Sequence, residues 1–237
     1  MRRDGRRPDE LRPVEFVRGF TRHTPGSVLL RAGQTVVLCT ASLEDDVPEW
    51  RRDSGLGWVT AEYDMLPGAT ATRRPRSRAR LDGRTQEIQR LIGRSLRAVV
   101  DMGRLGPRTI VLDCDVLQAD GGTRTAAITG AYVALVDAVA EGRRREYWNE
   151  GVVTAAVAAV SVGQVDGELL LDLSYDEDVR AAVDCNLVLT SAGQWVEVQA
   201  TGEHGAFTDA DLTRMTALGR AGLAQLFERQ RAALAGP

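Results

Sequence analysis

Apolar and polar residues alternate along much of the first third of the chain, a pattern typical of half-buried β-strands. We predict four strands there, over 14–20, 27–31, 35–42 and 58–63. Only three residues separate the second strand from the third, and this spacing predicts a hairpin. The polar stretch 44–54 contains a proline and predicts a loop.

The spacing of apolar residues becomes helical in three places. The predicted helices span 85–102, 125–141 and 209–233. Thr208 is the expected N-cap of the last helix, with Asp211 as its capping-box partner. Another alternating run, 109–118, predicts a strand directly before the second helix.

The second half of the chain repeats the order of strands before a helix. Its predicted strands span 152–162, 168–174, 187–190 and 195–200. We therefore predict an α+β fold, with mostly antiparallel sheets and helices packed on them, in a single domain of residues 1–237. Its approximate halves, 1–141 and 149–237, are joined by a charged connection, and their similar order fits an internal duplication.

Composition places the chain among globular proteins with a sizeable core, since 43% of its 237 residues are hydrophobic and 27% are charged. The net charge is −3, yet every basic side chain is Arg, whose planar fork suits phosphate oxygens. Three widely spaced cysteines and two distant histidines disfavour a disulfide framework or a thiolate zinc site. No apolar targeting stretch or membrane-length segment is present, so we expect a cytoplasmic protein with no membrane contact.

The stretch Gly121-Gly122-Thr123-Arg124 lies between a predicted strand and a predicted helix. Glycines let the backbone approach an anion closely, and the first N–H groups of a helix have no internal partner. Thr123 adds a hydroxyl and Arg124 adds several donors. The stretch predicts a phosphate site, although a tight turn with an exposed arginine is the simpler alternative.

Residues 67–83 contain prolines and glycines that exclude regular structure. The segment is rich in arginine: Arg73, Arg74, Arg76, Arg78 and Arg80, with Arg84 close behind. A solvated loop is one interpretation. A cluster of guanidinium groups in a chain of negative net charge also suits an RNA backbone.

Carboxylates gather after the strand predicted to end at 174, and Asp178 and Asp184 are the pair of interest. Residues 179–183 between them are small and apolar except for Arg180, and the stretch is compatible with one helical turn from whose two ends the pair would converge. Two carboxylates suit Mg²⁺, and either of them suits general acid catalysis. A solvated acidic turn is the alternative.

Taken together, these stretches resemble the ribonuclease PH family. The resemblance is carried by RDGR at 3–6, GWVTAEY at 57–63, GRTQEIQRLIGRSLR at 83–97, DCDVLQADGGTRT at 113–125 and VEVQ at 196–199. It implies a 3′–5′ exoribonuclease that uses inorganic phosphate in place of water and releases nucleoside 5′-diphosphates. Such enzymes trim tRNA precursors, with rRNA as a further candidate, run in reverse as nucleotidyltransferases and need Mg²⁺.

The same resemblance assigns roles to residues. It implies that Arg84, Gly122, Thr123 and Arg124 bind the attacking phosphate, and that Asp178 and Asp184 serve metal binding and proton transfer. It also implies a homohexamer, a trimer of dimers, which would gather arginine-rich loops from several subunits.

The chain departs from the family's usual AEYGMLPRATHTR at three positions, Asp64, Gly68 and Ala71. These changes concern the handling of RNA and leave the phosphate residues intact. They keep two alternatives open: a non-catalytic RNA-binding subunit of a similar ring, and a small-molecule nucleotidyltransferase on the same scaffold.

Overall fold

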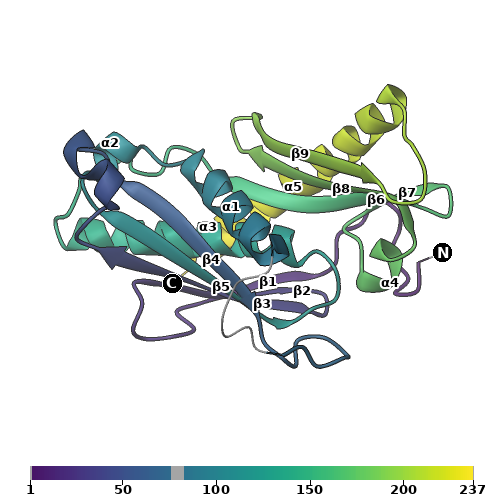
Figure 1. Cartoon of the computed structure of the whole chain (residues 1–237), viewed down its shortest axis with the longest axis horizontal. Coiled ribbons are helices and arrows are strands. Elements are labelled where there is room, and N and C mark those ends of the chain that lie inside the picture. Colours follow the sequence, from purple (N-terminus) through teal and green to yellow (C-terminus); the bar gives the residue numbers. More distant parts are fainter. Residues whose placement is uncertain (1, 76–82, 237) are drawn as a thin grey trace.

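The computed structural model describes residues 2–75 and 83–236 and contains two β-sheets, which lie side by side along its long axis (Figure 1). The strand order is β1-β2-β3-β5-β4 in the first sheet and β7-β6-β8-β9 in the second. The strands are β1 Val14–Arg18, β2 Gly26–Ala32, β3 Thr35–Glu44, β4 Trp58–Met65, β5 Thr109–Gln118, β6 Val157–Val165, β7 Glu168–Leu171, β8 Ala181–Thr190 and β9 Trp195–Gly202. Every pairing is antiparallel except that of β4 with β5.

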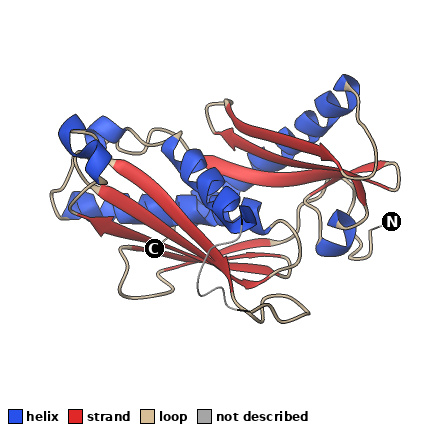
Figure 2. Ribbon diagram, in the orientation of Figure 1, coloured by secondary structure: helices blue, strands red, loops and turns tan. Residues whose placement is uncertain are grey.

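Helices pack on both sheets, which confirms the predicted α+β class (Figure 2). They are the 3₁₀ helix η1 Glu49–Ser54, and α1 Gly83–Arg97, α2 Met102–Leu105, α3 Thr123–Arg144, α4 Tyr175–Asp178 and α5 Asp209–Ala235. Helix α1 packs on β4, and α5 packs on β6 and β8. Within the described ranges, no helix has both the length and the apolar character that a membrane span requires.

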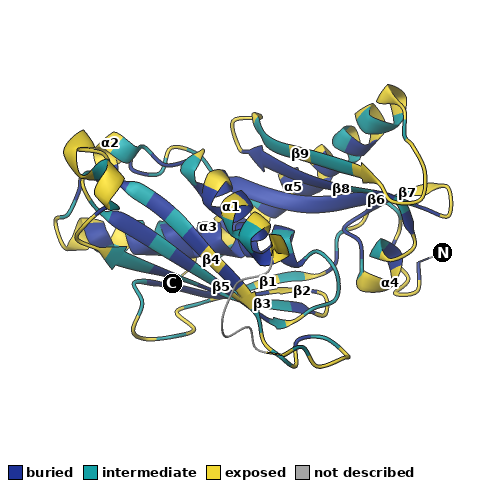
Figure 3. Ribbon diagram, viewed as in Figure 1, coloured by how far each residue is buried: buried dark blue, intermediate teal, exposed yellow. Residues whose placement is uncertain are grey.

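Helix α3 is the central element, because it packs against β2, β3 and β5 of the first sheet and against β6 of the second. The helical spacing of apolar residues predicts one apolar face, but Thr129, Gly130 and Val133 outside that face are also buried. Figure 3 shows buried ribbon along much of α3. A Cβ on Gly130 would lie only 2.9 Å from the sulfur of Cys39, so glycine permits the close approach of helix and sheet. Burial on most sides explains the weak amphipathic pattern of α3.

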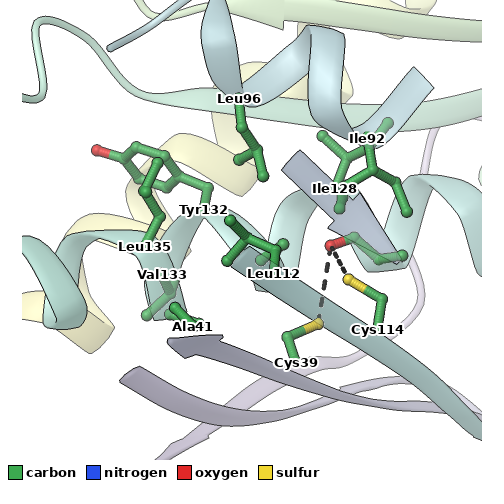
Figure 4. Close-up of a cluster of buried hydrophobic side chains, with 14 of the residues drawn as sticks. Cys39, Ala41, Ile92, Leu96, Leu112, Cys114, Ile128, Tyr132, Val133 and Leu135 are labelled. Carbon is green, nitrogen blue, oxygen red and sulfur yellow. Dashed lines mark hydrogen bonds between the residues drawn. The ribbon is translucent and has the colours of Figure 1, made fainter. Parts of the chain in front are cut away.

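The first core fills the space between α1, α3 and the inner face of the first sheet. In Figure 4, Ile92 and Leu96 of α1 face Leu112 of β5 across this core. The sulfurs of Cys39 and Cys114 lie 3.7 and 4.0 Å from the carbonyl oxygen of Ala127. All three cysteines are buried and free.

Some predicted boundaries are wrong. The helix predicted over 85–102 ends at Arg97, because Asp101 caps the separate helix α2 by accepting hydrogen bonds from the N–H groups of Gly103 and Arg104. Helix α3 continues to Arg144, into the predicted connection. The polar stretch 44–54 contains η1.

The N-cap predicted for the last helix is confirmed. The N–H of Asp211 donates to the Thr208 hydroxyl at 3.2 Å, and the N–H of Thr208 donates to the Asp211 carboxylate at 3.0 Å. These reciprocal bonds form a capping box at the start of α5.

Candidate active site

The glycine pair between β5 and α3 adopts a backbone conformation that favours glycine. Gly121 and Gly122 have φ of +73° and +63°. A Cβ on Gly121 would also lie 2.5 Å from the carbonyl oxygen of Leu173. Glycine is therefore required at Gly121 for two reasons, the positive φ and the lack of space for a Cβ. The turn is followed directly by Thr123 and Arg124, the first residues of α3.

Three side chains from other elements orient the start of α3. Arg124 donates hydrogen bonds to the Glu87 carboxylate of α1 and to the Gln199 side-chain oxygen of β9, each at 3.2 Å. The Tyr63 hydroxyl of β4 donates to the Thr123 hydroxyl oxygen at 2.9 Å. Because Thr123 is the acceptor in that bond, its own hydroxyl hydrogen remains free to donate to an anion.

The carboxylate pair has a different local structure from the one predicted. Asp178 is the last residue of α4, whereas Asp184 lies inside the long strand β8. The expected helical turn over 179–183 is wrong, since β8 already begins at Ala181. Asn186, two residues along the same strand, donates from its amide to the Asp184 carboxylate at 3.0 Å.

The surroundings of both carboxyls favour the protonated form. Burial raises the pKa of Asp178, against the opposing positive charges of Arg84 and Arg124. Burial and then the charge of Asp178 raise the pKa of Asp184 to about 6. The pair therefore lies in a partly desolvated site where a cation would relieve the repulsion between the carboxylates.

A cavity of about 550 Å³ brings the predicted residues together. Its lining includes Arg84, Gly122, Thr123, Arg124, Asp178 and Asp184. Residues more than 90 positions apart in the sequence thus line one cavity. A ligand in this cavity could contact the two guanidinium groups, the Thr123 hydroxyl and the acidic pair.

The arginine-rich segment is only partly within the described residues. Arg74 lines the same cavity, and Arg73 is exposed outside its lining. Arg76, Arg78 and Arg80 lie outside the described ranges. The three positions that depart from the family pattern, Asp64, Gly68 and Ala71, are exposed and are not among the lining residues.

Sequence reasoning missed several residues of the cavity. Asn186, Glu203 and His204 line it, and the negative charge of Glu203 contributes to raising the pKa of Asp178 and Asp184. Tyr175 and Val179 lie at its rim and are 59% and 56% exposed. A period of two along β8 could have revealed Asn186, because it shares a face with Asp184.

A larger hollow of about 690 Å³ lies on another side of α4 and contains no predicted site residue. Several of its charged side chains are engaged with one another: Arg3 pairs with Asp176, and Arg180 pairs with Asp166 at 2.9 Å. The chemistry therefore concentrates in the smaller cavity.

Comparison with known proteins agrees with this arrangement. Residues 10–141 match the model of domain 1 of the 3′ exoribonuclease family, and residues 155–222 match its domain 2. The fold is similar to that of Rrp46 from rice, with a TM-score of 0.80 at 19% identity over 98% of this chain and 100% of that one. An RNA-bound exosome from Archaeoglobus fulgidus gives a TM-score of 0.79 at 21% identity, over 96% and 92%. The two family-model matches place the chain in a class, the 3′ exoribonuclease family.

Relatives that are similar in sequence over the whole chain identify one family within this class. Ribonuclease PH from Rhodococcus erythropolis is 57% identical over 100% of this chain and 92% of its own length. Ribonuclease PH from Corynebacterium kroppenstedtii is 54% identical over 100% and 94%. The chain belongs to the ribonuclease PH family.

Proposed function

We propose that the protein is a phosphate-dependent 3′–5′ exoribonuclease that trims RNA 3′ ends, tRNA precursors above all. The observation that supports this most directly is the cavity that combines a helix N-terminus, two arginines and two carboxylates. The full-length relatives named ribonuclease PH support the same activity.

In the proposed reaction, an oxygen of inorganic phosphate attacks the phosphorus of the terminal nucleotide. The bond from that phosphorus to O3′ of the preceding nucleotide breaks, and O3′ takes up a proton. The terminal nucleotide leaves as a nucleoside 5′-diphosphate. Reversal of the same steps adds a nucleotide, so one site serves as a nucleotidyltransferase.

Positioning is the main task of such a site, because both reactants are anions. Arg84 and Arg124 would neutralise the attacking phosphate, while the glycine turn and the Thr123 hydroxyl would orient it. Asp178 and Asp184 have raised pKa values and would exchange the proton with O3′.

Magnesium is the cofactor that this proposal implies. In the described part of the chain, no group of three or more His, Cys, Asp or Glu side chains is placed to hold a metal. Two carboxylates in one cavity still fit Mg²⁺, which keeps several waters and is often completed by substrate phosphates. Bound by Asp178 and Asp184, it would supply charge neutralisation between the two phosphates.

The rim of the cavity supports RNA as the substrate. Arg73 and Arg74 would contact the RNA backbone, and the sequence assigns the same role to Arg76, Arg78 and Arg80. Tyr175 offers an exposed ring, and Val179 follows it on the same turn, with its N–H donating to the Tyr175 carbonyl at 3.0 Å. Such an apolar pair suits stacking of a terminal base.

Replacement of Tyr175 tests this rim. We expect Tyr175→Ala to raise the KM for a tailed tRNA about tenfold, since a stacked base contributes roughly 1–3 kcal/mol. Tyr175→Phe keeps the ring and should behave like the wild type. The KM for phosphate should stay unchanged in both variants, and an equal rise in both KM values would contradict a role in base stacking.

Dependence on phosphate tests the proposed function itself. A tRNA with a 3′ tail is incubated with the protein and Mg²⁺, with and without inorganic phosphate, and products are separated by chromatography. We expect nucleoside diphosphates only with phosphate. RNA retained on a filter without any turnover would favour the non-catalytic subunit instead. Turnover of free nucleotides without RNA would favour the small-molecule transferase.

A homohexamer, a trimer of dimers, is proposed from the family resemblance, and one of the similar solved structures is an exosome assembly. Sedimentation equilibrium should give six times the chain mass of 25.7 kDa. A monomer mass at micromolar concentration would contradict it. The proposed reaction implies action in the cytoplasm.

A further inference from the structure

Two side chains far away in sequence hold the carbonyl groups of the glycine turn. The Thr35 hydroxyl donates to the carbonyl oxygen of Gly121 at 2.8 Å and accepts from the N–H of Asp120 at 2.9 Å. The Arg12 guanidinium donates to the carbonyl oxygen of Asp120 at 2.5 Å. Thr35 is fully buried and Arg12 is 5% exposed, so neither contact competes with bulk water.

Because the peptide bond is planar, these contacts to the carbonyl groups also fix the direction of the N–H groups of Gly121 and Gly122. In a trans peptide, the carbonyl oxygen and the following N–H point in opposite directions. Holding the carbonyls of Asp120 and Gly121 inward therefore directs the N–H groups of Gly121 and Gly122 away from Arg12 and Thr35. Among residues 2–75 and 83–236, neither N–H has a hydrogen-bond acceptor, and both glycines line the cavity.

Arg12 is itself fixed by a buried carboxylate. Asp172 accepts from the Arg12 guanidinium at 2.7 and 3.0 Å and from its backbone N–H at 2.8 Å. Burial alone would raise the pKa of Asp172, but the charge of Arg12, its hydrogen bonds and the charge of Arg6 together outweigh burial, and the pKa is lowered. The guanidinium is thus a charged, rigid donor whose position depends on the segment that follows β7.

We propose that Thr35 and Arg12 are positioning residues for phosphate. By pinning two carbonyls of the turn, they present the N–H groups of Gly121 and Gly122 to the attacking anion. This inference rests on the proposed phosphate-dependent activity. Neither residue touches the substrate, so their effect reaches the reaction through the geometry of the turn.

Thr35→Val is the decisive variant, because valine keeps the shape of threonine and removes only the hydroxyl. We expect the KM for inorganic phosphate to rise about tenfold, as for a buried hydrogen-bonding group left without its partner. The KM for tailed tRNA should stay within about twofold. Thr35→Ser restores the hydroxyl and should restore the phosphate KM. Arg12→Lys keeps a charge beside Asp172 but loses the fork, and it should also raise the phosphate KM.

Thr40→Val is the matched control: Thr40 lies on the same strand β3, and its hydroxyl bonds Asp113 at 3.5 Å, away from the turn. A second measurement avoids turnover, namely the rise in melting temperature on adding phosphate in EDTA, which Thr35→Val should reduce. A wild-type phosphate KM in Thr35→Val, or equal rises in both KM values, would overturn the proposal. A wild type that needs no phosphate would instead overturn the proposed function.

Discussion

Arg124→Ala should lower kcat/KM for inorganic phosphate by about 10²–10³-fold, the range found when one donor to a developing or reacting anion is removed. Arg124 lines the cavity and is held in place by Glu87 and Gln199. Alanine leaves these two partners solvated at the cavity edge, so the fold should tolerate the change. Initial rates over a phosphate series would measure the loss, and filter binding should show that RNA affinity is largely kept.

Arg94→Ala is the matched control for Arg124→Ala. Arg94 also joins α1 to β9, through an ion pair with Glu197 at 2.8 Å, but it does not line the cavity. We expect rates close to those of the wild type, because an exposed ion pair contributes little. An equal loss in both variants would mean that the arginines matter for the packing of α1 on β9 and would contradict a role in phosphate binding.

Asp184→Asn should lower kcat by at least about 10²-fold, since the variant loses a carboxylate that can move a proton or hold a cation. Asparagine is nearly isosteric, and binding of RNA should persist. Asp176→Asn is the control: Asp176 lies on the same short helix as Asp178 but faces the other hollow. Single-turnover rates of tail removal would measure both variants, and an active Asp184→Asn would remove Asp184 from the mechanism.

The same substitution should stabilise the protein. The pKa of Asp184 is about 6 in the folded state, above the ordinary 3.8, so the unfolded chain gives up this proton more readily. Folding stability therefore falls as the pH rises from about 4 through 6, because the ionised carboxylate is less favourable inside the cavity. In EDTA, Asp184→Asn should melt above the wild type at pH 8 and close to it at pH 4. A lower melting temperature at pH 8 would contradict this assignment.

The glycine turn of the candidate site could be predicted from sequence because it is local. The strand, the glycine pair and the start of the helix follow one another from Thr109 to Arg124. The left-handed conformation of Gly121 and Gly122 can be expected from the residue type alone, because glycine has no Cβ. The presence of Arg84 in the same cavity required the family resemblance, since its helix α1 lies elsewhere in the chain.

Contacts between distant elements could not be predicted. The short stretch 179–183, apolar except for Arg180, is compatible with either a helical turn or a strand, and pairing of β8 with β6 and β9 makes a strand of it from Ala181 onward. The partners of Arg124 come from α1 and β9, and those of the glycine turn come from the N-terminal arm and β3. Secondary-structure propensities of single residues carry no information on such pairings, which depend on tertiary packing.

The burial of α3 between the two sheets has a consequence for how the molecule could be divided. Val157, Ala159 and Val188 of the second sheet belong to the same core as α3, and the Gln230 amide of α5 donates to the Thr129 carbonyl at 3.0 Å. A chain cut at residue 150 would expose the side of α3 that faces β6 in one fragment, and in the other it would leave the second sheet with α5 but without α3. Fragment complementation would therefore have to rebuild the packing around α3 before the proposed phosphate site at its N-terminus could form.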